Sequence, residues 1–215
     1  MHNARKKRQV PFTVIGIVLL VAALALAGYN LWRDAAAGAS AESALEELLP
    51  ELPEEVTNAV TDPVPGVTDA GEQVIPDYQL DPDMAMPTKT ADGQAYIGVL
   101  SIPKLGKTLP ILSEWDAAKL NIAPCRYAGS AYQNNLVIAG HNYRRHFGRL
   151  GTLSPGDNII FTDMDGNRFT YQVVELETLQ PYAIEEMKTG DWDLTLFTCT
   201  LGGQTRMTVR CELVS

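Results

Sequence analysis

The chain has 215 residues and a formal net charge of −9, from 17 basic and 26 acidic residues. This length accommodates one ordinary domain with additional segments. The negative charge excludes a typical nucleic-acid-binding protein, which would present a basic face, and three cysteines are too few, and odd in number, for a disulfide framework.

The N-terminal region contains an uncharged apolar stretch at residues 10–32, VPFTVIGIVLLVAALALAGYNLW. Its length matches the roughly 20 residues that a helix needs to cross a bilayer. Basic residues at 5–8 precede it, which predicts a cytoplasmic tail at 1–9 and the rest of a single-pass membrane protein outside the cell. A competing interpretation is a cleavable signal peptide, because Ala25-Leu26-Ala27 resembles a small-x-small cleavage site.

Residues 33–90 are rich in Glu, Asp, Ala and Pro and carry most of the excess acid. This composition predicts a solvated extracellular stalk that holds a folded domain away from the membrane. A short helix is expected within 40–49, where Pro50 and Pro53 would end it.

Residues 91–215 form the expected folded domain, because short apolar runs with β-branched residues alternate there with turn signals. Strands are expected at Tyr96–Ile102, Thr108–Leu112, Leu136–Ala139, Asn158–Thr162, Phe169–Leu176, Leu194–Thr198 and Met207–Val214. Short helices are expected at Trp115–Leu120 and Phe147–Leu153, and one further helical turn at Ile184–Lys188. This pattern predicts a mainly β domain with a closed or sandwich-like sheet.

Cys199 is the strongest candidate for a reactive cysteine. It ends the run Leu194–Cys199, and loops on a rigid scaffold often present functional side chains. The short segment 200–205 contains two glycines and leads into a second strand that begins at Arg206. The two strands are therefore expected to be hairpin neighbours, which would bring Arg206 close to Cys199.

A reactive thiol also needs a base or a cation near it, since its ordinary pKa is about 8.5. His141 is the best candidate base, because it follows the apolar run Leu136–Ala139 and a glycine. His2 lies in the predicted tail, and His146 lies in the basic sequence Arg144-Arg145-His146, which is typical of a solvated surface.

The other two cysteines, Cys125 and Cys211, lack the setting of Cys199. Cys211 lies within an alternating apolar strand, which is typical of a core thiol. We expect both to be free and buried, and a disulfide between them stays open for an extracellular protein. No cysteine has the spacing of a zinc site.

A resemblance then connects these residues. Thr195-Leu196-Phe197-Thr198-Cys199 matches in full the Thr-Leu-x-Thr-Cys signature of sortases. The chain order agrees, with Gly140-His141-Asn142 first, then the cysteine, then an arginine in the next strand. Arg206 fits that position better than Arg210, which shares its face by strand alternation but lies deeper in the strand. Over about residues 91–215 the chain resembles the sortase family.

The resemblance implies a closed eight-stranded β-barrel with short helices, preceded by the transmembrane helix. It implies that Cys199 attacks the threonine carbonyl of a Leu-Pro-x-Thr-Gly-like sorting signal. His141 would exchange protons with the leaving and incoming amines, and Arg206 would stabilise the oxyanion or hold the substrate. Thr198 would help to shape the substrate groove, and the Thr200 N–H would be a second oxyanion donor.

The implied partners are secreted proteins that carry a C-terminal sorting signal. The implied acceptor is an amine of a cell-wall peptide precursor or of a pilin, outside a Gram-positive-type cell, and no cofactor is expected. Class D or class A is the closer resemblance, because the connection 178–193 is too short for the helical insertion of class B. Class C enzymes carry a lid with an Asp-Pro-aromatic motif, and Asp81-Pro82-Asp83 lacks the aromatic.

Some class A sortases bind calcium through loop carboxylates. Asp163, Asp165, Glu175 and Glu177 are available here, but Asp163–Asp165 is first of all typical of a hairpin turn. The sequence therefore predicts no required metal.

Two other functions stay open. An exported cysteine hydrolase of the peptidoglycan-peptidase kind would place its cysteine before its histidine, which is opposite to the order of His141 and Cys199. A non-enzymatic, membrane-anchored adhesion or sensory domain would leave Cys199 unreactive.

Overall fold

The structure, a computed structural model, describes residues 12–51 and 75–214. The predicted cytoplasmic tail at 1–9, the basic residues at 5–8 and the middle of the predicted stalk at 52–74 lie outside the described residues. The division of the chain into tail, anchor, stalk and catalytic domain stays a prediction.

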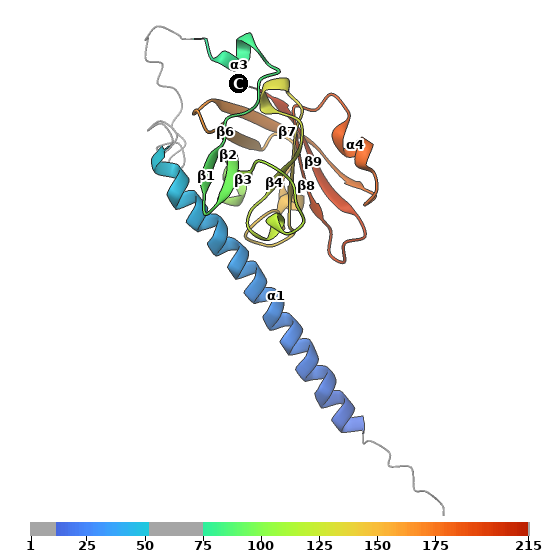
Figure 1. Cartoon of the computed structure of the whole chain (residues 1–215). Coiled ribbons are helices and arrows are strands. Elements are labelled where there is room, and N and C mark those ends of the chain that lie inside the picture. Colours follow the sequence, from blue (N-terminus) through green and yellow to red (C-terminus); the bar gives the residue numbers. More distant parts are fainter. Residues whose placement is uncertain (1–11, 52–74, 215) are drawn as a thin grey trace, which may run out of the picture.

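The folded domain is one sheet of nine strands in the order β1-β2-β3-β4-β5-β8-β9-β7-β6. The strands are β1 (Lys89–Ala91), β2 (Gln94–Ile102), β3 (Lys107–Leu112), β4 (Cys125–Ala128), β5 (Leu136–Gly140), β6 (Asn158–Asp163), β7 (Arg168–Leu179), β8 (Leu194–Cys199) and β9 (Arg206–Leu213). Pairing of β2 with β6 closes strands β2 to β9 into a barrel, and β1 extends β2 as a short hairpin outside the ring. The expected closed eight-stranded β-barrel is therefore confirmed (Figure 1).

All seven strands expected from the sequence are present, and the structure adds β1 and β4. The helices expected at Trp115–Leu120 and Phe147–Leu153 are shorter than predicted, because each is reduced to one 3₁₀ turn, η3 (Lys119–Asn121) and η5 (Leu150–Thr152). The turn at Ile184–Lys188 is confirmed as α4. The remaining short helices are α3 (Asp77–Leu80), η1 (Leu49–Glu51), η2 (Pro103–Leu105) and η4 (Ala131–Gln133).

The barrel interior is filled by alternating apolar side chains of its strands, including Ile97, Leu100, Ile138, Leu196 and Val209. This alternation is what a half-buried strand requires, since successive side chains point to opposite faces. The strands are thereby fixed in register, and the ends of β5, β8 and β9 are held at defined positions.

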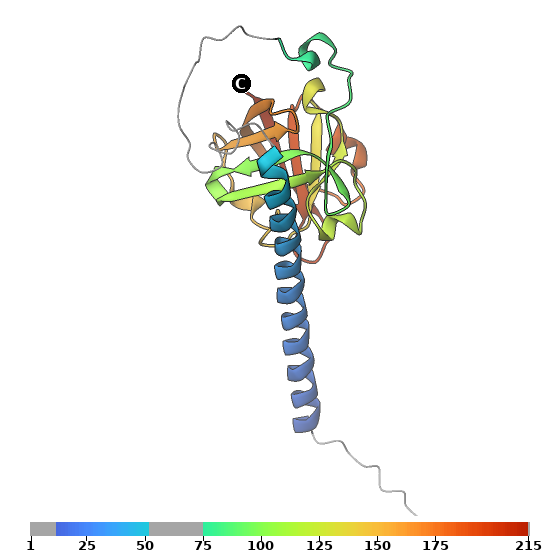
Figure 2. The same ribbon diagram turned by 60° about the vertical axis from the view of Figure 1, so that its left-hand side comes forward.

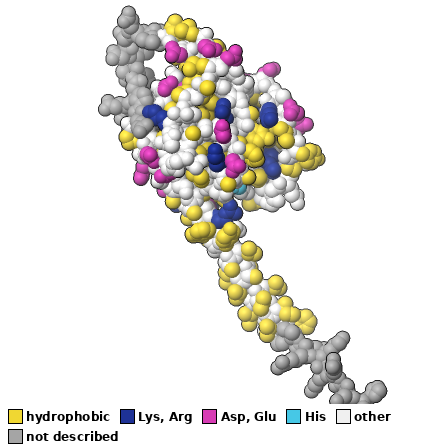
Figure 3. All heavy atoms as spheres, viewed as in Figure 1, with side chains coloured by type: hydrophobic (Ala, Val, Ile, Leu, Met, Phe, Trp, Pro, Cys, Tyr) yellow, Lys and Arg dark blue, Asp and Glu magenta, His cyan; other side chains and the backbone are white. Residues whose placement is uncertain are grey.

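Helix α1 (Phe12–Leu48) is longer than either segment expected from the sequence. Among the described residues it is the one helix that is long and apolar enough to cross a membrane, and none of the residues in its most apolar 18-residue window is buried. Figure 3 shows this half covered with hydrophobic side chains. The helix continues without a break through the first part of the predicted stalk and ends at Leu48, before Pro50.

The second half of α1 packs on the outside of the barrel (Figure 2). Ala37, Ala41, Ala44 and Leu48 are buried at the helical spacing of three and four residues. Ala44 and Leu48 belong to a second apolar cluster with Ala91, Tyr96, Val99, Leu112, Ala123, Cys125 and Met164. The stretch 37–48 is thus part of the folded unit, which the acidic composition of residues 33–90 did not indicate.

Cys125 and Cys211 are both free and buried, as expected. They lie in different apolar clusters, Cys125 beneath α1 and Cys211 in the barrel interior. Burial raises the pKa of the Cys125 thiol to about 11 and that of Cys211 to about 12. Both thiols are therefore inert at neutral pH.

Candidate active site

Cys199 is the last residue of β8 and lies at the wall of a groove on the outside of the barrel. Leu194 and Leu196 point into the barrel interior, so strand alternation turns Phe197 and Cys199 the other way, and both line the groove. The thiol is half-buried, which makes it accessible to a substrate, in contrast to the other two cysteines.

Arg206 begins β9 and is the direct cross-strand partner of Cys199 in the antiparallel ladder. The two side chains therefore leave the hairpin on the same face. The Arg206 Nη1 donates to the carbonyls of Gly203 at 3.0 Å and Thr205 at 3.1 Å. These bonds hold the guanidinium at the mouth of the groove, which it lines together with Cys199.

Arg210, the weaker arginine candidate, has a structural role. Its side chain is 2% exposed, and its Nε pairs with the Glu177 carboxylate at 2.6 Å. The remaining donors bond the Thr195 hydroxyl at 2.9 Å and the carbonyls of Glu186 and Met187 at 2.6 and 3.2 Å. Arg210 thus fastens α4 to strands β7 and β8, and each of its three side-chain nitrogens is already hydrogen-bonded.

His141 follows directly after β5, which pairs in parallel with β8 so that Gly140 lies opposite Thr198. The residues that come next, His141 and Cys199, therefore leave the same edge of the sheet at neighbouring positions. A Cβ at Gly140 would lie 2.5 Å from the Phe147 ring, so only glycine allows the loop after β5 to fold back this closely. The structure contains no hydrogen bond between the His141 ring and Cys199 among the described residues.

The His141 ring packs against the Tyr143 ring, with centroids 4.7 Å apart. Burial, and next the positive charge of Arg33 on α1, lower the pKa of His141 below its ordinary value of 6.5. The imidazole is therefore neutral at neutral pH in the absence of substrate, which is the state that accepts a proton.

His146 corrects the sequence-based interpretation of a solvated surface residue. It is fully buried, and its Nε2 lies 3.3 Å from the Ala37 carbonyl of α1. Burial lowers its pKa to about 4. Sequence reasoning missed this because the covering helix is 109 residues away in the chain.

Thr198 and Thr200, the two residues predicted to contact the substrate, are both held by the end of β8 and the turn after it. Thr198 is buried on the interior face and does not line the groove, and its hydroxyl is unpaired within the described structure. The Thr200 N–H donates to the Thr205 carbonyl at 3.0 Å, so it can reach an oxyanion only when that bond opens. The hydroxyls of Thr200 and Thr205 are also hydrogen-bonded to each other at 2.8 Å, which stabilises the β8–β9 connection.

The groove has a volume of about 260 Å³ and is mainly apolar apart from the reactive end. It is lined by Trp115, Leu120, Tyr127, Ala139, Gly140, Gln180, Pro181, Ala183, Ile184, Met187, Phe197, Cys199 and Arg206. One wall is thus the β7–β8 connection with α4, and this wall is the one that Arg210 fastens. Such a groove is suited to an apolar ligand, and a thiol and a cation lie together at its reactive end.

Two of the four carboxylates considered for calcium serve other contacts. Asp163 accepts bonds from the Tyr132 hydroxyl at 2.6 Å and from the N–H groups of Asp165 and Asn167, so it shapes the β6–β7 hairpin. Glu177 pairs with Arg210. In the described parts of the chain no three His, Cys, Asp or Glu side chains gather as a metal site, and the need for a metal stays untested.

Comparison with known proteins places this geometry in context. A family model described as the sortase domain matches residues 100–214. Among solved structures, a sortase D5 transpeptidase of Clostridium perfringens is 20% identical, covering 78% of this chain and 98% of that one with a TM-score of 0.52. Sortase A of Listeria monocytogenes is 21% identical, with coverage of 56% and 88% and a TM-score of 0.50.

A third similar structure is sortase C2 of pilus island 1 of group B Streptococcus, at 22% identity, coverage of 63% and 85%, and a TM-score of 0.50. At these identities the structural likeness shows the fold. The comparison with curated proteins gives no match.

Proposed function

The chain belongs to the sortase family, and on that premise we propose that it is a membrane-anchored transpeptidase with Cys199, His141 and Arg206 as its catalytic residues. The observation that carries this assignment is the register of three strands. Cys199 faces Arg206 across the β8–β9 ladder, and the parallel pairing of β5 with β8 brings His141 to the same edge.

The substrate is a secreted protein with a Leu-Pro-x-Thr-Gly-like signal bound in the apolar groove. Neutral His141 takes the proton of the Cys199 thiol as the sulfur attacks the threonine carbonyl carbon, and the guanidinium of Arg206 donates to the developing oxyanion. The C–N bond to glycine then breaks, and the leaving amine takes a proton from the His141 imidazolium. A thioacyl enzyme and a free C-terminal peptide result.

The second half of the reaction restores the enzyme. An acceptor amine of the cell-wall precursor or of a pilin attacks the thioacyl carbonyl, and neutral His141 takes the proton from that amine. The C–S bond breaks, the new amide is released, and His141 returns the proton to the Cys199 sulfur, so that the thiol and the neutral imidazole are restored. In this scheme Thr198 helps to shape the groove from beneath the end of β8, and the Thr200 N–H is a second oxyanion donor when its bond to the Thr205 carbonyl opens.

The subclass we favour is D or A. The β7–β8 connection contains only the five-residue helix α4, which supports a short connection rather than a long helical insertion. Residues 5–8 and the apolar half of α1 support an anchor with the barrel outside the cell.

The test is mass spectrometry of the full chain in detergent micelles, incubated with a Leu-Pro-x-Thr-Gly-like peptide library and triglycine. We expect cleavage after threonine and transfer to triglycine, and loss of both in Cys199→Ala, His141→Ala and Arg206→Ala. Release of the free acid alone, with triglycine present in excess, would favour a hydrolase. No cleavage, together with ordinary alkylation of Cys199, would favour a binding domain.

A further inference from the structure

The loop that carries His141 is held by the membrane helix rather than by the barrel alone. Residues 141–147, which we call the histidine loop, contact residues 33–42 of α1, which we call the juxtamembrane segment. The Arg145 N–H donates to the Asp34 carboxylate at 3.3 Å, and the Arg145 Nη1 donates to Glu42 at 2.9 Å. The loop is thereby bonded to α1 at its backbone and at a side chain.

Tyr143 is the centre of this contact. Its ring lies beside the ring of His141 on one side and that of His146 on another, with centroid distances of 4.7 and 5.7 Å. The Arg33 guanidinium lies 5.8 Å from the centre of the same ring. Arg33 and the Tyr143 hydroxyl also donate to the same side-chain oxygen of Asn121. A path of direct contacts therefore runs from Arg33 through Tyr143 to the ring of His141.

Two further features belong to the contact between the juxtamembrane segment and the histidine loop, which is part of the seam between α1 and the barrel. The buried His146 lies against the Ala37 carbonyl, and Ala37 is 2% exposed. At Gly38 a Cβ would lie 1.9 Å from the Arg145 Cδ. The absence of a side chain at Gly38 thus leaves the space in which Arg145 crosses the helix toward Glu42.

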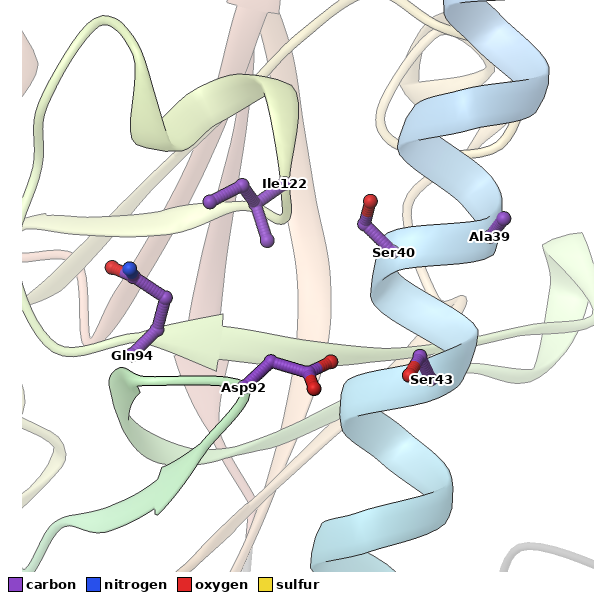
Figure 4. Close-up of a pocket in the computed structure, with 6 residues that line it drawn as sticks. All are labelled: Ala39, Ser40, Ser43, Asp92, Gln94 and Ile122. Atoms are coloured by element: carbon purple, nitrogen blue, oxygen red, sulfur yellow. The ribbon is translucent and has the colours of Figure 1, made fainter.

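The buried stripe of α1 makes two kinds of contact with the barrel. The upper one is the apolar packing of Ala44 and Leu48 on the strands, and the lower one is the polar contact with the histidine loop. Figure 4 shows an open pocket beside the helix, lined by Ser40 and Ser43 of α1 and by Gln94 and Ile122 of the barrel side. Directed hydrogen bonds therefore distinguish the lower contact from the apolar packing above it.

The lower contact also lies where the apolar part of α1 ends. No charged residue occurs between Phe12 and Trp32, and Arg33 and Asp34 are the first charges. Because α1 is unbroken from Phe12 to Leu48, the helix that can cross the membrane reaches the histidine loop within its first turns beyond the apolar stretch.

From these contacts we propose that the juxtamembrane segment positions the catalytic loop, with Arg33 and Tyr143 as the positioning residues for His141. This inference rests on the proposed function of His141. The segment acts through the loop and touches neither the thiol nor the groove. The charged or titratable groups set against His141 are Arg33 from α1 and Tyr143 and His146 from its own loop, with Cys199 and Arg206 on the neighbouring strands β8 and β9.

The experiment uses the full chain in nanodiscs with three variants, Arg33→Gln, Arg33→Lys and Tyr143→Phe. We expect Arg33→Gln to lower kcat about tenfold with little change in KM, since a small displacement of a catalytic group costs rate rather than affinity. The limb of the pH profile that reports His141 moves to higher pH, because the opposing cation is gone. Arg33→Lys keeps that limb in place, and Tyr143→Phe lowers kcat without moving it.

The matched control is Glu47→Gln. Glu47 lies on the same helix and accepts a bond from the Asp92 N–H at the other end of the seam, so kcat and the pH profile stay at their wild-type values. Hydrogen exchange of the segment 141–148 is followed in parallel, since its amides are bonded within the loop. Exchange speeds up in Arg33→Gln and not in Glu47→Gln.

Equal kcat, equal pH profile and equal exchange in Arg33→Gln and wild type would overturn the proposal. A lower kcat and a shifted pH limb in Arg33→Gln, together with an unshifted limb in Arg33→Lys, support positioning by charge and contact. If the wild type itself cuts no peptide, the proposed function has failed, and loop exchange in Arg33→Gln then decides alone whether α1 holds the loop.

Discussion

Cys199 and Arg206 are direct partners across the antiparallel ladder of β8 and β9, so a permanent cation emerges beside the only half-exposed thiol among the described cysteines. The pair needs no distant element to bring it together, because a short hairpin connection sets the register. In the proposed mechanism this cation donates to the oxyanion, and its bonds to the Gly203 and Thr205 carbonyls hold it beside the thiol.

The first prediction concerns this cation. Arg206→Met should lower kcat/KM by about 10² to 10³, the usual effect of removing one donor from an oxyanion site. The melting temperature should change little, because the Arg206 bonds are made at the edge of the hairpin. Peptide-cleavage kinetics and thermal unfolding measure the two effects, and a variant with the kcat/KM of the wild type would refute the role.

The second prediction uses Arg210 as the structural counterpart. Arg210→Met should destabilise the protein by about 3 kcal/mol, because it leaves the Glu177 carboxylate and two carbonyls without their donor. Chemical denaturation measures this. Since α4 forms a wall of the groove, KM for the peptide should rise as well, and an unchanged unfolding free energy would contradict the assignment.

The third prediction concerns pH and stability through His146. Its pKa is about 4 in the folded protein against an ordinary value of 6.5, so the unfolded chain binds the proton more readily. The stabilisation is therefore complete above pH 6.5 and is lost as the pH falls from 6.5 to 4, by about 3 kcal/mol in total.

His146→Gln is the variant that isolates this effect. It should flatten the dependence of the unfolding free energy on pH between 7 and 4, although its stability at pH 7 is lower. Denaturation curves at several pH values provide the comparison. The same slope in the variant and the wild type would mean that other groups cause the acid sensitivity.

The fourth prediction concerns α1. A soluble piece that begins at residue 33 should unfold at a higher temperature than one that begins at residue 75, because only the first keeps Ala44 and Leu48 on the barrel. Burial of one leucine side chain alone contributes about 1.5–3 kcal/mol. Equal melting temperatures would show that the helix does not cover the barrel in solution.

The sequence predicted what local patterns encode. Alternation and turn signals located seven strands, and the run ending at Cys199 followed by the start of a strand at Arg206 predicted their pairing. The short strand β4 was missed because Cys125–Ala128 offers little alternation. The sequence could not distinguish the structural role of Arg210 from the role proposed for Arg206. Arg210 is buried by contacts with α4 and β7, and the alternation of residues along β9 does not reveal these contacts.

The contact of α1 with the histidine loop was invisible for a different reason. The composition was judged over the whole segment 33–90, which is acidic and contains prolines. The regular spacing of the buried residues Ala37, Ala41, Ala44 and Leu48 occupies only a small part of that segment and was therefore not recognised. His146 was assigned to the surface because its sequence neighbours are charged, whereas its actual neighbour is Ala37.

Acyl-enzyme formation on Cys199 is tested by trapping the intermediate and locating it by peptide mass spectrometry. The full chain in detergent micelles is mixed with a peptide bearing a Leu-Pro-x-Thr-Gly-like signal without any amine, quenched in acid and digested. We expect a thioester adduct on the proteolytic fragment that contains Cys199, with an acyl group that ends at the substrate threonine, and we expect it to disappear when triglycine is added. Cleavage of the peptide without such an adduct, or an adduct on another residue, would contradict acyl-enzyme formation on Cys199.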